Sequence, residues 1–303
     1  MLGDFNNDGK VDLALNNFGG GGVFIFLGNG DGTFTQGSSY ASLYNSWSIT
    51  ATDIDGDGNL DLVVGSGNSG AIGPDVDHGI GLVEILMGNG DGTFQGAPLY
   101  PATESTAGTS TVSFTAGDFN GDGKPDVLAA KSGLMFMAGN GKGEFAAGVT
   151  TSGPNPTLVT SALMNADKNL DAVFIDYNQS SQTSQIGVAF GNGDGTFAAT
   201  NDYPLPSSAT SLITLITADV NGDGYPDVVA TGLTSSGSAL YVFLNDGTGA
   251  LKAGQLVDTG TDEYQIVAAD LNGDGKLDLV VADAGANSGE EGADVKVYLR
   301  LVF

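Results

Sequence analysis

One short acidic segment recurs along the chain with the pattern Asp-x-Asn/Asp-x-Asp-Gly-x-x-Asp. Intact copies span residues 4–12, 53–61, 118–126, 219–227 and 270–278. In so tight a turn, carboxylate and amide oxygens at positions one, three and five can point toward a common centre, and glycine at position six permits the sharp bend. Ca²⁺ takes roughly six to eight hard oxygen ligands of this kind. The spacing therefore predicts calcium sites, one in each of the five intact loops.

The predicted calcium ligands are the side chains of positions one, three, five and nine and the main-chain carbonyl of position seven. In chain order the residues are Asp4, Asn6, Asp8, Lys10, Asp12; Asp53, Asp55, Asp57, Asn59, Asp61; Asp118, Asn120, Asp122, Lys124, Asp126; Asp219, Asn221, Asp223, Tyr225, Asp227; and Asp270, Asn272, Asp274, Lys276, Asp278. An EF-hand carries glutamate at position twelve, between helices. These loops carry Leu, Val or Ala there, between strand-like segments, so we expect EF-like loops on β-hairpins.

A degenerate copy, the fourth of six in chain order, runs from Leu163 to Asp171. Leu163 replaces the first aspartate and Lys168 replaces the glycine. We expect no calcium in this loop, with Lys168 supplying local positive charge instead. Asp, Asn and Gly are also ordinary turn formers, so one copy alone could be no more than a turn. Five copies that keep every key position favour metal binding.

The composition excludes several classes of protein. Asp and Glu number 36, thirty of them Asp, against nine Lys plus Arg, and the net charge of the 303 residues is −27. Such a chain lacks the basic face that nucleic-acid binders need, and anionic lipid would repel it. No apolar run approaches the ~18 residues of a membrane helix, so no membrane insertion is expected. The lack of cysteine excludes a thiolate zinc site, and a single histidine excludes multi-histidine metal sites.

A glycine-rich segment follows each of the first five acidic copies. It spans residues 28–34, 88–94, 139–145 and 191–197, with a looser copy at 245–251. Asp-Gly at this place is typical of a tight hairpin turn. The segment lacks the ending and the following helix of a phosphate loop, so nucleotide binding is not expected. We expect hairpins whose phenylalanines pack between neighbouring sheets, namely Phe34, Phe94, Phe145 and Phe197.

Short apolar runs between the two motifs have the length and composition of β-strands. They are rich in β-branched and aromatic residues and are bounded by Gly, Asn or Asp. Four strands in each repeat of roughly 50 residues predict an all-β protein, a β-propeller of four-stranded antiparallel blades. A solenoid is the alternative, but ring closure would remove exposed sheet edges and so favours the propeller.

Six blades are recognisable within a single predicted domain, residues 1–303, and an intact protein with seven blades is compatible with the pattern. The approximate blade ranges are 1–45, 46–108, 109–154, 155–208, 209–261 and 262–303. The first strand of blade one is nearly missing before Asp4, and the last strand of blade six is missing after Phe303.

The segments Gly3 to Asp12 and Gly117 to Asp126 closely resemble the FG-GAP or VCBS repeat, as does the glycine-rich motif followed by Gly96, Ala97 and Pro98. The resemblance covers nearly the whole chain. It implies a calcium-binding β-propeller like the integrin α-chain head, certain fungal lectins and many bacterial surface proteins. It further implies that calcium lies between the first two strands of a blade. Ligands would then meet the opposite face, through the loops that follow the second and fourth strands.

The loop at residues 66–81 and the connection before blade two are the candidates for ligand binding. The connection holds Tyr44 and Trp47, and the loop holds Asp75, Asp77 and His78. A flat aromatic ring beside Asp, Asn and His groups is typical of a sugar-binding groove. The alternative is that Trp47 begins a core strand and that the loop is an ordinary insertion.

The predicted function is a non-catalytic, calcium-stabilised binding or adhesion module whose partner is carbohydrate or protein. A polysaccharide lyase, a glycosidase-like propeller enzyme and a pure spacer are the alternatives. A lyase needs a constellation of His, Tyr, Lys or Arg, and a chain with a single His and a single Arg is a poor candidate for such an enzyme. Weakly binding calcium loops suit calcium-rich surroundings, so we expect an extracellular or cell-surface location, although residues 1–20 show no signal-peptide pattern.

Overall fold

The computed structural model describes residues 1–16, 22–41, 46–66, 82–101, 113–130, 133–178, 183–206, 209–235, 237–260, 263–283 and 294–298. All the regular elements in these ranges are β-strands, which confirms the all-β prediction. The same ranges contain no helix with the length and apolar character needed to cross a membrane.

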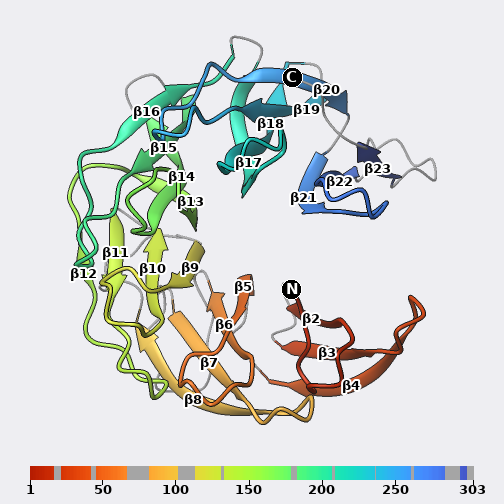
Figure 1. Cartoon of the computed structure of the whole chain (residues 1–303). Coiled ribbons are helices and arrows are strands. Elements are labelled where there is room, and N and C mark those ends of the chain that lie inside the picture. Colours follow the sequence, from red (N-terminus) through yellow and green to blue (C-terminus); the bar gives the residue numbers. More distant parts are fainter. Residues whose placement is uncertain are drawn as a thin grey trace. The chain divides into compact units, whose positions relative to one another are not determined.

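The chain folds into two compact units. Unit 1 comprises Met1–Gly153 and Asp194–Thr196, and unit 2 comprises Pro154–Gly193 and Phe197–Phe303. Within every sheet of either unit, strands that follow one another in the sequence are neighbours and run antiparallel (Figure 1).

Unit 1 carries three four-stranded blades. Blade one has β1 (Leu2–Gly3), β2 (Asp12–Asn16), β3 (Val23–Gly28) and β4 (Phe34–Tyr40); blade two has β5 (Ser46–Thr52), β6 (Asp61–Ser66), β7 (Leu82–Gly88) and β8 (Phe94–Pro101); blade three has β9 (Ser113–Gly117), β10 (Asp126–Ala130), β11 (Leu134–Met137) and β12 (Val149–Thr150). In each blade the acidic loop joins the first two strands and the glycine-rich motif joins the last two.

Unit 2 carries two four-stranded blades and a sixth with three described strands. Blade four has β13 (Pro156–Ala162), β14 (Asp171–Asn178), β15 (Thr183–Ala189) and β16 (Asn201–Pro204); blade five has β17 (Ala209–Ala218), β18 (Asp227–Thr234), β19 (Gly237–Phe243) and β20 (Gln255–Gly260); blade six has β21 (Glu263–Ala269), β22 (Asp278–Asp283) and β23 (Asp294–Tyr298). These six antiparallel blades confirm the predicted β-propeller fold. The single domain and a seventh blade stay predictions.

Neighbouring blades within a unit bury apolar side chains between their faces. Between blades one and two, Phe5 and Ile25 share a buried cluster with Leu62, Val64 and Phe94. Between blades four and five, a second cluster joins residues of β14 and β15 to residues of β18 and β19. The middle strands supply these faces, because β10, β14 and β18 are buried along nearly their whole length and successive side chains point to opposite faces of the sheet.

The hairpin phenylalanines do not all behave as predicted. Phe94 is 6% exposed and meets Phe5 and Tyr40 edge-on, with ring centroids 5.7 Å apart in both pairs. Phe34 is 42% exposed, so the prediction that it packs between sheets is wrong for this residue. Phe94 thus packs on blade one, as predicted.

These environments give a matched pair of substitutions. Phe94→Ala removes a buried ring and should lower the free energy of unfolding by about 3–5 kcal/mol, whereas Phe34→Ala should cost well under about 1 kcal/mol. Urea unfolding followed by fluorescence measures both. Equal losses for the two variants would contradict the packing described here.

Candidate metal centres

Backbone N–H groups hold the carboxylates of each intact loop in place. In the loop of blade two, Asp53 Oδ1 accepts the N–H of Gly56 at 2.8 Å and Asp53 Oδ2 accepts that of Gly58 at 3.0 Å. Asp55 Oδ1 accepts the N–H of Asp57 at 3.1 Å. The bond from position six to position one recurs in all five intact loops. The backbone of the turn therefore orients the carboxylates of positions one and three.

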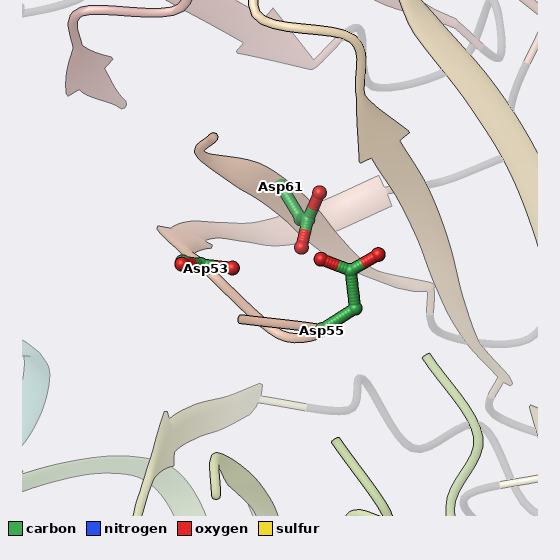
Figure 2. A group of neighbouring side chains, drawn as sticks. All are labelled: Asp53, Asp55 and Asp61. Carbon is green, nitrogen blue, oxygen red and sulfur yellow. The ribbon is translucent and has the colours of Figure 1, made fainter. Parts of the chain in front are cut away.

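The loop of blade two gathers three carboxylates. Asp53, Asp55 and Asp61 each offer an oxygen, and these oxygens all lie within 4.8 Å of one another. Figure 2 shows the three side chains gathered at the turn between β5 and β6. Clustered hard oxygen donors suit Ca²⁺ better than softer transition metals. The other four intact loops carry asparagine at position three, which offers an amide oxygen in place of the carboxylate.

Position six has left-handed backbone in all six loops. The φ angles are 81° to 90° at the five glycines and 70° at Lys168 of the degenerate loop. A left-handed residue with a side chain costs about 1–2 kcal/mol, so the degenerate loop keeps the turn at an energetic cost. The described residues include no ion pair of Lys168. Its role as a local positive charge stays a prediction.

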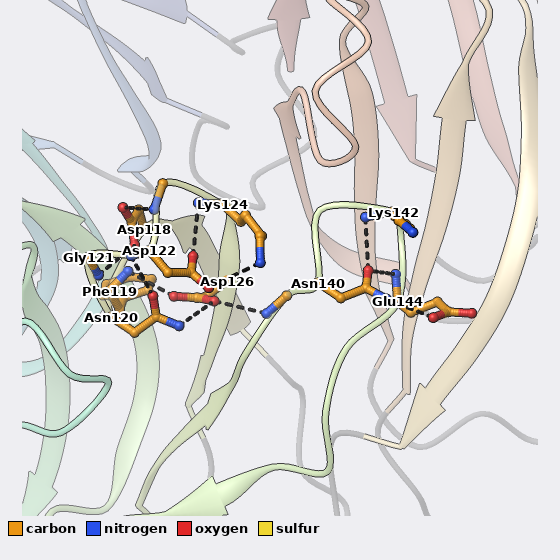
Figure 3. A network of polar contacts seen from close by, with 12 residues as sticks. Asp118, Phe119, Asn120, Gly121, Asp122, Lys124, Asp126, Asn140, Lys142 and Glu144 are labelled. Carbon is orange, nitrogen blue, oxygen red and sulfur yellow. Dashed lines mark hydrogen bonds and ion pairs between the residues drawn. The ribbon is translucent and has the colours of Figure 1, made fainter.

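Position nine, a predicted metal ligand, also holds the backbone of its blade. Asp61 Oδ2 accepts the N–H of Ile54 at 2.7 Å, and Oδ1 accepts the N–H of Gly88 at 2.7 Å. One carboxylate thus binds both position two of the loop and the first residue of the hairpin. We call this carboxylate with its two N–H donors the aspartate clamp. The clamp recurs at Asp12, Asp126, Asp171 and Asp227. Figure 3 shows Asp126 within the network of the third loop.

The clamp aspartates are buried, and burial changes their titration. Burial raises the pKa of Asp61, Asp126 and Asp171, and it raises the pKa of Asp227 to about 6. The two accepted N–H groups act in the opposite direction, because they stabilise the ionised form. A cation bound in the same turn would act in that direction too.

In the first five loops the side chain at position seven lies against the hairpin of its own blade. Lys10 Nζ lies 3.2 Å from Asp8 Oδ2 in an exposed pair, which contributes little stability. A Cβ added at Gly30 would lie 3.1 Å from Lys10 Cδ, and one added at Gly141 would lie 3.0 Å from Lys124 Cδ. The second glycine of the hairpin therefore leaves room for this side chain. Coordination by the position-seven carbonyl stays a prediction.

The predicted ligand-binding residues are placed only in part. Trp47 lies in β5, the strand position that the alternative interpretation gives it. Tyr44, Asp75, Asp77 and His78 lie outside the described residues. The sugar-binding groove stays a prediction.

Comparison with known proteins gives a family and a fold. A model described as FG-GAP-like repeat matches residues 4–64, 69–129, 164–230 and 219–281, and a model described as FG-GAP repeat matches residues 110–154 and 264–299. No curated protein matches the chain.

Two solved structures are similar to this one. An Agrocybe aegerita lectin, described by its specific recognition of non-reducing terminal N-acetylglucosamine, is 20% identical with a TM-score of 0.62, and the match covers 99% of this chain and 79% of the lectin. The V. cholerae biofilm matrix protein Bap1 is 12% identical with a TM-score of 0.46, and the match covers 99% of this chain and 76% of Bap1. At 20% identity, the similarity to the lectin supports the fold of this chain and nothing about its ligand.

The clamp can be tested where no calcium is expected. Asp171→Ala leaves the buried N–H groups of Met164 and Gly191 without an acceptor, so it should lower the free energy of unfolding by about 2–5 kcal/mol, even in EDTA. Asp167→Ala, in the same loop but exposed, is the control and should cost less than about 1 kcal/mol. If the two variants unfold at the same urea concentration, the clamp carries no stability.

Proposed function

The chain belongs to the FG-GAP repeat family, and on this premise we propose that it is a non-catalytic, calcium-stabilised binding module that works outside the cell or on its surface. The observation that carries the proposal is the repeated loop geometry. Position six donates to position one in all five intact loops, and loop two gathers three carboxylates. The degenerate loop lacks the first aspartate that accepts this bond.

Calcium would be held by the side chains of positions one, three, five and nine. When bound it supplies positive charge that offsets the repulsion between neighbouring carboxylates and cross-links the loop between the first two strands of a blade. Five such ions would bring the net charge from −27 to about −17. The ion is thus a structural element, and the loops at the other end of each blade are left for ligands.

The proposed ligand is a carbohydrate or a protein. The sugar interpretation is supported by the aromatic and polar residues around Trp47 and His78, and terminal N-acetylglucosamine, which the similar lectin recognises, is the first sugar to test. The enzyme alternative has little support in the composition, which offers one His and one Arg. A spacer remains the alternative if no ligand binds.

Calcium binding should be measurable both as a number of bound ions and as an increase in the stability of the protein. EDTA should lower the melting temperature clearly, because the neighbouring carboxylates of each acidic loop then repel one another. Asp57→Ala and Asp122→Ala should each remove one ion from the calcium count obtained by native mass spectrometry. Asp167→Ala, the matched control in the degenerate loop, should remove none. An unchanged melting temperature in EDTA would contradict the structural role.

Ligand binding can be tested with a glycan array. We expect a signal on one glycan class, with terminal N-acetylglucosamine included, and its loss in Trp47→Ala at unchanged melting temperature. If no glycan on the array is bound, the hypothesis of a sugar ligand is wrong. Cleavage of pectin or another polysaccharide, abolished by His78→Ala, would instead favour the enzyme alternative.

A further inference from the structure

Asparagine begins the fifth hairpin motif, where glycine begins the other four. A Cβ added at Gly28, Gly88, Gly139 or Gly191 would lie 2.0–2.2 Å from the carbonyl oxygen of position eight in the acidic loop of the same blade. No side chain fits there without a shift of the backbone. Asn245 nevertheless occupies this place, and it is only 1% exposed.

The Asn245 side chain uses all of its hydrogen-bonding capacity. Nδ2 donates to the carbonyl of Pro226, the position-eight residue of blade five, at 3.1 Å and to the carbonyl of Met164 at 2.7 Å. Oδ1 accepts the N–H groups of Gly247 at 3.1 Å and Gly249 at 3.0 Å. An amide offers two donors and two acceptor lone pairs, so none is left unpaired. A fully satisfied buried amide fixes one arrangement of its neighbours.

The contact with Met164 crosses from blade five to blade four. Met164 is position two of the degenerate loop. At the junction of blades one and two the equivalent carbonyl, that of Phe5, accepts the N–H of Gly92 at 2.9 Å. In blade five, Gly249 takes the place of Gly92 but donates to Asn245 instead. The substitution therefore occurs in the blade that packs on the one loop lacking the first aspartate and the glycine.

We propose that Asn245 is a calcium-independent brace, which positions the hairpin of blade five against the degenerate loop of blade four. Its side chain meets only neutral carbonyl and N–H groups, while its backbone N–H belongs to the clamp of Asp227 in the intact loop of blade five. The brace keeps this junction docked when calcium is withdrawn, whereas the junctions beside intact loops loosen. This contrast between junctions rests on the proposed function, but the brace itself does not.

Asn245→Asp tests the brace, because the variant keeps the shape and places a carboxylate oxygen against two carbonyl oxygens. Its melting temperature should fall by about 5 °C or more, and by the same amount in calcium and in EDTA. Asn89→Gly, which changes an exposed asparagine of the second hairpin, should change it little in either condition. A stable Asn245→Asp variant, or a loss seen only in calcium, overturns the proposal.

Hydrogen exchange of the unaltered protein gives a readout that needs no variant to fold. On addition of EDTA, residues 162–171 and the N–H groups of Gly247 and Gly249, which the Asn245 side chain accepts, should keep their protection, while residues 53–61 and 88–94 should lose theirs. Equal loss in both sets overturns the brace. If no segment responds to EDTA, the proposed calcium role fails, and the Asn245→Asp result still decides the brace.

Discussion

The two N–H groups that each clamp aspartate accepts are the contacts on which the geometry of a blade depends. In blade one, Asp12 ties Phe5 of the acidic loop to Gly28 at the start of the hairpin. Removing such a buried acceptor leaves two N–H groups unpaired, which is costly. The clamp therefore holds the loop and the hairpin together, and in blade two its carboxylate lies within the same group as those of positions one and three.

Position two links this local geometry to the packing of blades. Its N–H belongs to the clamp, and in loop one its carbonyl, that of Phe5, accepts the N–H of Gly92 from the next blade. Its side chain is buried in loops one to five, whereas Leu271 of the last loop is 52% exposed. The aspartate clamp and the docking of the next blade thus share one residue. Where the turn lacks its first aspartate, the Asn245 amide makes the corresponding contact.

Much of this could be predicted from the sequence, because the relevant signals are local and repeated. The loop spacing predicts the left-handed position six, and the strand lengths predict the blades. The double role of Asp61 could not be predicted, because Ile54 and Gly88 lie 7 residues before it and 27 after it, and only the strand register brings them together. Phe34 was predicted wrongly because burial of a hairpin phenylalanine depends on the blade beside it. In the sequence, Asn245 is only a departure from the glycine that begins the other hairpin motifs, and its role becomes clear from its hydrogen-bond partners.

Anomalous scattering from crystals grown with a calcium-substituting lanthanide is the most direct test. Calcium and lanthanide ions prefer the same hard oxygen ligands, so each occupied turn should give one peak. Peaks are expected inside the loops at residues 4–12, 53–61, 118–126, 219–227 and 270–278, and none at 163–171. Empty acidic turns, or a peak in the loop that begins at Leu163, would contradict this expectation.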